Sequence, residues 1–192
     1  MPIPNQAALE FLQTRRSRPA KTLTTPVPDP DALRALLTIA ARTPDHKKLE
    51  PWRFIVLEKP ALERLAALIP ARAAALDIAP EAAEKMVRQF ADADLAVAVI
   101  GTPKPRDDVP EIEQVLSAGA ACYGLLAAAL AAGWGANWLT GWAVYDRPFV
   151  EQGLGLQPQE FVAGFIHIGS EKARPPERPR PDVDAITEWV RE

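Results

Sequence analysis

The sequence is poor in the residues that build metal centres and disulfide bonds. It has one cysteine, Cys122, and two histidines, His46 and His167, among 192 residues. One cysteine cannot form a disulfide within the chain, and such usage is typical of a reducing compartment, so we expect a cytoplasmic protein. A single cysteine and two distant histidines do not predict a zinc site, so we expect no metal.

Several catalytic signatures are also missing. The chain contains no GxGxxG, no GxxxxGK[ST] and no HExxH sequence, and neither Ser117 nor Ser170 lies in a nucleophile-elbow context. These absences argue against a Rossmann dinucleotide fold, a P-loop, a zinc protease and a serine hydrolase of the α/β type.

A positive charge excess is missing too. The formal net charge of −3 argues against a dedicated nucleic-acid binder, and the first residues lack the basic segment and apolar run of a secretory signal. Residues 115–145 carry no charge at all, and their length alone would suit a membrane span. Alanine dominates them, however, and Gly133 and Gly135 divide them, so we expect a buried helix followed by a buried strand and no membrane contact.

The remaining sequence predicts helices and strands that alternate irregularly. Asp29 and Pro30 form an N-cap and first-turn pair before one helix, and Thr43-Pro44 should end it. No repeat is visible, so we expect one α/β or α+β domain over residues 1–192. The expected helices are 5–16, 31–42, 60–76, 80–93, 110–132 and a short one in the C-terminal tail; the expected strands are 52–58, 94–101, 135–144 and 160–169.

Two basic segments are suited to phosphate. Residues 15–21 (RRSRPAK) place four cations around the hydroxyl of Ser17, and residues 177–181 (ERPRP) add two arginines. Guanidinium groups match phosphate oxygens bidentately. Each segment could equally be a solvated basic loop. The cations are Arg15, Arg16, Arg18 and Lys21 in the first segment, and Arg178 and Arg180 in the second.

Two further segments remain ambiguous by themselves. Residues 43–54 (TPDHKKLEPWRF) mix cations, carboxylates, a histidine and a tryptophan. They could be a helix C-terminus whose cations, with Arg42, favour the helix dipole, followed by a core residue, Trp52. Residues 138–142 (WLTGW) could be a plain buried strand in which Gly141 permits close approach.

The order of these segments along the chain resembles the nitroreductase family of FMN-dependent oxidoreductases, most closely its small branch with a histidine in the second motif. The resemblance covers almost the whole chain, from residues 15–21 through 41–58 and 117–142 to 161–170 and the Arg/Pro tail. It implies an α+β sandwich, in which a central, mainly antiparallel sheet is flanked by helices. It also implies an intertwined homodimer with two FMN sites at the subunit interface.

The same resemblance implies roles for particular residues. Arg15, Arg16 and Ser17 would bind the flavin from one subunit, while Arg42 and His46 of the partner subunit approach it from the other side. Arg178 or Arg180 would complete the phosphate clamp. The residues implied to cover a ring face, with hydrogen bonds through backbone groups, are Trp138, Leu139 and Thr140.

We therefore expect an FMN-dependent NAD(P)H oxidoreductase. Hydride would come from NADH or NADPH, and the acceptor would be a small molecule such as a nitroaromatic compound, a quinone or an enone. The chemistry is the flavin's, so no catalytic side chain is expected. One alternative is a flavin-binding carrier or sensor without turnover, and a weaker one is a nucleic-acid binder that uses residues 15–21.

Overall fold

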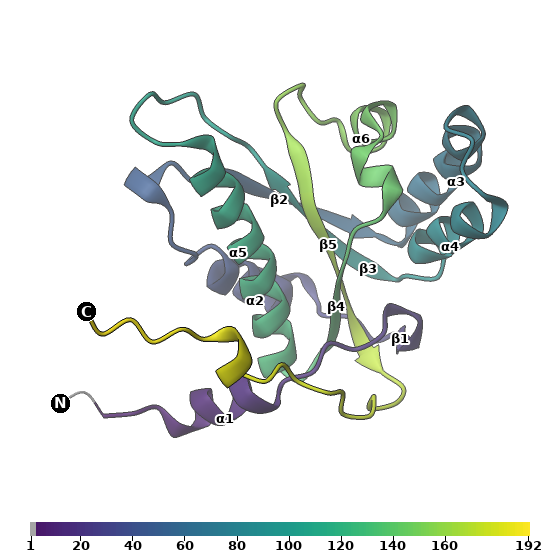
Figure 1. Cartoon of the computed structure of the whole chain (residues 1–192). Helices are drawn as coiled ribbons and strands as arrows, with labels where there is room; N and C mark the ends of the chain where they lie inside the picture. The colour runs from purple at the N-terminus through teal and green to yellow at the C-terminus, as the bar shows by residue number, and fades with distance from the viewer. Residues whose placement is uncertain (1–2) are drawn as a thin grey trace.

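The computed structural model describes residues 3–192 and is built around a five-stranded sheet (Figure 1). The strand order is β1-β5-β3-β2, and β4 also pairs with β5. Every paired strand is antiparallel to its neighbour, which confirms the antiparallel sheet expected from the sequence. The strands are β1 Leu23–Thr24, β2 Trp52–Glu58, β3 Leu95–Gly101, β4 Gly135–Leu139 and β5 Phe161–Glu171.

Helices cover both faces of this sheet (Figure 1). The continuous apolar run of β3 is buried at every residue, because it has a helical layer on each side. The α2–α5 layer packs one core on the sheet, and the other three helices pack a second core on the opposite face. The covering helices are α2 Pro30–Ala40 and α5 Glu111–Ala131 on the first face, and α3 Lys59–Ala75, α4 Pro80–Ala91 and α6 Arg147–Leu154 on the second.

The uncharged stretch folds as a core helix followed by a strand, as predicted, but the strand is buried only at Gly135 and Ala136, and Trp138 is 36% exposed. Helix α5 is long and apolar enough to cross a membrane by length and composition, yet half of its most apolar window is buried in the fold. Cys122 and Leu125 lie in the core at 0% exposure. The opposite side of α5 is apolar but open to solvent, with Ile112 61% and Leu116 65% exposed.

Three predicted elements differ from the structure. The strand expected over 135–144 ends at Leu139, because Gly141 adopts a φ of 131° and the chain turns into the 3-10 helix η3, Trp142–Tyr145. The C-terminal tail holds only one 3-10 turn, η4 Asp184–Ile186, instead of a helix. The first helix, α1 Gln6–Thr14, stops before Arg15 and Arg16.

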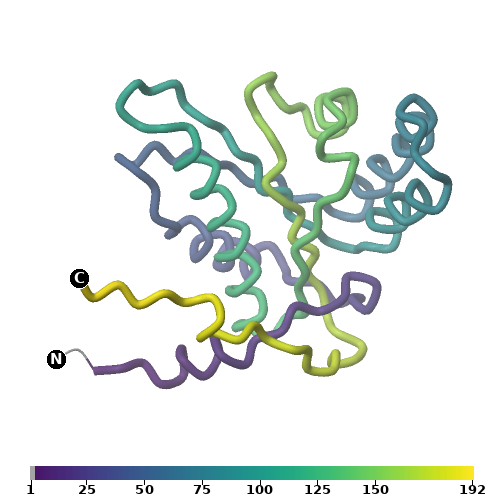
Figure 2. The backbone as a smooth tube through the Cα atoms, in the orientation of Figure 1, coloured from purple at the N-terminus to yellow at the C-terminus, as the bar shows by residue number. Residues whose placement is uncertain are grey.

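The two ends of the chain leave the body on the same side (Figure 2). The loop that follows α1 is joined to the C-terminal tail by an ion pair between Arg16 and Glu177. Both arms carry apolar side chains that are open to solvent, including Leu12 at 51% and Trp189 at 78% exposure. The arms therefore bury little apolar surface within one chain.

Candidate functional site

The first basic segment forms a loop that is fixed against strand β4. The backbone N–H of Arg18 donates to the carbonyl of Ala136 at 2.8 Å. The Arg18 guanidinium pairs with Glu171 and donates to the carbonyl of Arg16 at 2.8 Å. Arg18 is thus occupied in shaping the loop, although the sequence grouped it with the phosphate-binding cations.

Arginines from both ends of the chain converge beside this loop. Nη1 of Arg16 and Nη2 of Arg180 lie 3.1 and 2.8 Å from the same carboxylate oxygen, Oε1 of Glu177. The pKa of Glu177 is lowered, most strongly by the hydrogen bond from the backbone N–H of Arg178 and to a smaller extent by the guanidinium groups of Arg16 and Arg180. A carboxylate held by two arginines marks a position that suits an anion.

Arg15 lies on the other side of the same loop. Its guanidinium carbon is 5.3 Å from the centre of the Tyr123 ring on α5, in cation–π geometry. Its Nε is buried and has no hydrogen-bond partner among residues 3–192. A buried donor without a partner is costly, so this atom is available for a ligand acceptor.

A groove of about 590 Å³ continues from the loop toward α4. Its walls combine the end of the loop with one face of β4 and the polar side of α4. The Gln89 amide on α4 donates to the carbonyl of Thr140 at 3.1 Å and so ties α4 to the end of β4. The groove is lined by Pro19, Ala20, Lys21, Lys85, Arg88, Gln89, Asp92, Ala93, Asn137 and Leu139.

Strand alternation separates two residues that the sequence grouped together. Leu139 faces the groove, whereas Trp138 points to the other face of the sheet and lies against Gly164. The Trp138 indole N–H donates to the carbonyl of Ala163 at 3.3 Å. Within one chain, therefore, Leu139 and Trp138 do not cover the same face of a ligand.

The histidine of the second motif lies at the other end of α5 from Tyr123, while Thr43 packs on Gly124 beside that tyrosine. His46 Nδ1 is 2.6 Å from Oε2 of Glu113, in the first turn of α5. Tyr123, beneath Arg15, lies ten residues further along that helix, which is about 15 Å along its axis. Arg42 is exposed just after α2 and makes a backbone bond to Ile39.

The structure thus brings together only some of the expected site residues. Of these, Ser17 and Thr140 lie in the segments that border the groove, while the side chain of Arg178 makes no hydrogen bond or ion pair within residues 3–192. The structure brings Arg180 to the loop that carries Arg15, Arg16 and Ser17, and the end of that loop borders the groove lined by Leu139. Thr140 follows Leu139 in the chain, Trp138 faces the other side of the sheet, and Arg42 and His46 lie in a separate segment.

Sequence reasoning missed the contribution of α4. Lys85, Arg88 and Gln89 belong to the polar side of an amphipathic helix, and that pattern alone is typical of any solvated helix. Only the packing of α4 beside β4 shows that this side borders a groove.

The potential metal ligands are dispersed over the described residues, and the single thiol is buried. No group of three potential metal-binding His, Cys, Asp or Glu side chains occurs within residues 3–192. Burial raises the pKa of the Cys122 thiol to about 12, so it stays protonated at neutral pH.

Comparison with known proteins shows relatives over most of the chain. "Putative NAD(P)H nitroreductase YdjA" of Escherichia coli (strain K12) is 34% identical over 167 residues, which are 87% of this chain and 90% of the relative. A "Putative NAD(P)H nitroreductase" of Haemophilus influenzae is 36% identical over 169 residues, covering 86% and 90% of the two chains.

Solved structures share the fold. The nitroreductase-like family protein from Bacillus cereus aligns with a TM-score of 0.79 at 22% identity, over 99% of this chain and 98% of that one. A "putative nitroreductase in complex with fmn" from Desulfovibrio desulfuricans aligns with a TM-score of 0.75 at 21% identity, over 97% of this chain and 99% of that one. The Nitroreductase family model matches residues 12–170, and this chain therefore belongs to the nitroreductase family.

Proposed function

We propose that the protein is an FMN-dependent NAD(P)H oxidoreductase that reduces nitroaromatic compounds, quinones or related electron-poor acceptors. The observation that carries this proposal is the convergence of Arg16 and Arg180 on one carboxylate oxygen of Glu177. FMN is an anion at its phosphate end, and these two arginines supply the charge-assisted donors that such an end requires; the buried free Nε of Arg15, on the other side of the loop, is a further donor.

The groove suits the remainder of the same molecule. Leu139 offers an apolar surface, and the Asn137 and Gln89 side chains add polar groups to the same groove. Lys21, Lys85 and Arg88 place positive charge around the groove, which favours a ligand that becomes negative on reduction. FMN, when bound, supplies the hydride-transfer chemistry between NAD(P)H and the acceptor, and the chain supplies binding, cover and charge.

We infer that the working unit is a homodimer. A side of α5 that includes Ile112, Leu116 and Tyr123 is exposed and apolar, which is typical of an interface rather than of a monomer surface. Two copies that pack along α5 would also let Arg42 and His46 of the partner subunit approach a groove that these residues do not reach within their own chain. We also propose that residues 1–192 form one domain and that the protein works in the cytoplasm.

Purification followed by anaerobic titration tests this function. We expect a yellow protein from which heat releases FMN, and we expect NADH or NADPH to bleach the colour and an electron-poor acceptor to restore it. Colour that NAD(P)H does not bleach would favour the carrier or sensor alternative. A protein that ignores added FMN would contradict the proposal.

A further inference from the structure

His167 on β5 is a buried polar side chain without a partner. Only 1% of the residue is exposed, and neither Nδ1 nor Nε2 has a hydrogen-bond partner among residues 3–192. A neutral imidazole has one donor and one acceptor, and leaving both unsatisfied in the interior is costly. Such a group calls for a partner outside the protein chain.

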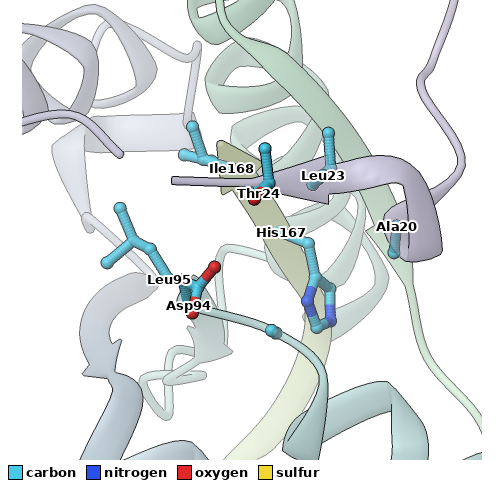
Figure 3. A pocket seen from close by; sticks show the side chains of 8 residues that line it. Ala20, Leu23, Thr24, Asp94, Leu95, His167 and Ile168 are labelled. Atoms are coloured by element: carbon cyan, nitrogen blue, oxygen red, sulfur yellow. The ribbon is translucent and has the colours of Figure 1, made fainter. Parts of the chain in front are cut away.

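The imidazole borders a small internal cavity. Figure 3 shows the ring projecting from β5 into the space between the segment that carries Ala20 and the turn that carries Asp94. The cavity volume is about 10 Å³, which is the space that one water molecule requires. Asp94 and Thr24 also line it and add polar groups to the two ring nitrogens.

The cavity lies directly beside the groove. Ala20 and Ala93 line both the cavity and the groove. We call the segment that carries Ala20 the first wall of the groove and the segment that carries Ala93 the second wall; both also border the cavity at the imidazole. Asn137, which faces the groove, is the cross-strand partner of His167 and points to the same side of the sheet. A hydrogen-bond partner for His167 in this cavity would therefore also stabilise the segments that line the groove.

The second wall is held by Lys59, at the start of α3. Lys59 Nζ donates to the carbonyls of Ala91 and Ala93 at 2.7 and 3.2 Å, and lies 3.9 Å from Asp94. The first wall is joined to β5 by the ion pair of Arg18 with Glu171 and by the pairing of Leu23 and Thr24 with the strand. None of these links reaches the imidazole, and a water at His167 would add a polar link between the ring and the cavity lining.

We propose that the cavity holds one ordered water, hydrogen-bonded to His167, and that His167 is through it a positioning residue for the groove walls at Ala20 and Ala93. The water bridges the imidazole to polar groups of the segments around Thr24 and Asp94. The consequence for ligand binding rests on the proposed flavin function, whereas the hydration itself does not.

Two measurements on the apo protein test the hydration and the wall support. In ¹⁵N-edited NOE spectra, the His167 ring N–H should show a cross-peak to a long-lived water; a visible ring N–H without one would overturn the proposal.

Hydrogen exchange at residues 20–24 and 93–95 should become at least several-fold faster in His167→Phe, which fills the site without polar atoms. His167→Gln, which keeps a donor and an acceptor, should restore much of the protection.

The control variant is Ile166→Val, a buried neighbour on the opposite face of β5. It should leave exchange in both segments as in the wild type; equal acceleration in the control and in His167→Phe would overturn the positioning role. FMN affinity should fall roughly 3- to 10-fold in His167→Phe and recover in His167→Gln. If the wild type binds no FMN, the proposed function fails, and the NOE and exchange results still decide this inference.

Discussion

His46 and Glu113 are joined by a contact of 2.6 Å that fixes the second motif at the N-terminal end of α5. The first motif meets α5 ten residues later, where Arg15 stacks on Tyr123. His46 therefore lies about three turns of α5 from the contact between Arg15 and Tyr123, although Thr43, at the start of the same motif, packs on Gly124 beside Tyr123. A site that combines His46 with Arg15 is therefore more easily formed in the proposed dimer, with α5 against α5, than within one chain.

This arrangement predicts that a charge on the exposed side of α5 separates the dimer. Leu116→Glu should produce a monomer that binds FMN at least tenfold more weakly, because a buried, unpaired carboxylate is costly at an apolar interface. Light scattering of the purified variant gives the mass. Leu76→Glu, at an exposed site (45%) that ends α3, is the matched control and should stay dimeric. A wild type that is a flavin-loaded monomer would contradict the prediction.

Arg16 is predicted to be the strongest single contributor to FMN binding in the first motif. Its side chain is only 16% exposed and points at the shared carboxylate of Glu177. A charge-assisted hydrogen bond contributes about 1.5–3 kcal/mol, so Arg16→Ala should weaken FMN binding roughly 10- to 100-fold. Arg16→Lys should recover only part of this affinity, since an ammonium group cannot replace a planar guanidinium fork.

Fluorescence titration of the apo proteins with FMN measures this effect. Thermal melts should differ little, because Arg16 lies in a loop and adds little to the core. Arg34→Ala, an exposed arginine on α2, is the control and should bind FMN as the wild type does. Unchanged affinity in Arg16→Ala would mean that residues 15–21 are a solvated basic loop.

The sequence predicted the elements whose patterns are local. The unbroken apolar run of β3 and the Asp29–Pro30 start of α2 appear as expected, and the Asp29 carboxylate accepts from the Ala32 N–H. Helix α6 was missed because only eight residues form it, too few to show a clear period. The end of β4 was missed because a glycine in a strand-like segment does not reveal its φ, here 131°, or its close approach to Met86 from distant α4.

The site was less predictable than the fold, because its parts come from distant segments. The motifs indicated Arg16 and Leu139, but no local pattern showed that α4 would line the groove or that Trp138 would face away from it. His167 looked like an ordinary strand residue, and only its burial without a partner singles it out.

His167 also predicts how stability depends on pH. Burial lowers its pKa from 6.5 to about 4. Below pH 6.5 the imidazole therefore becomes protonated in the unfolded chain, whereas in the folded chain it stays neutral down to about pH 4. The free energy of unfolding consequently falls as the pH drops through this window. The loss from this residue should be about 2 kcal/mol between pH 6.5 and pH 5.

Urea denaturation of the apo protein at several pH values checks this dependence. His167→Phe should lose less stability than the wild type over the same window, because the phenyl ring does not titrate. Asp94, Asp92, Lys21 and Lys59 lie on the segments around the imidazole and are retained in both proteins, so the difference between the two curves isolates His167. Parallel curves would show that the imidazole is not held neutral by burial.

Glu177 provides the final prediction, because its carboxylate occupies the position between Arg16 and Arg180 that we assign to the FMN phosphate. An anionic ligand must displace this carboxylate. Glu177→Gln removes the competing charge while keeping the side-chain shape, and should therefore strengthen FMN binding. The gain should be modest, about 2- to 5-fold, since Glu177 is 63% exposed and ion pairs of exposed side chains contribute little. Inorganic phosphate should compete with FMN more effectively in this variant than in the wild type.

Titration of apo wild type, Glu177→Gln and the tail control Glu188→Gln with FMN measures the difference, and the control should match the wild type. Weaker binding in Glu177→Gln would show that the carboxylate positions the arginines for the ligand instead of competing with it.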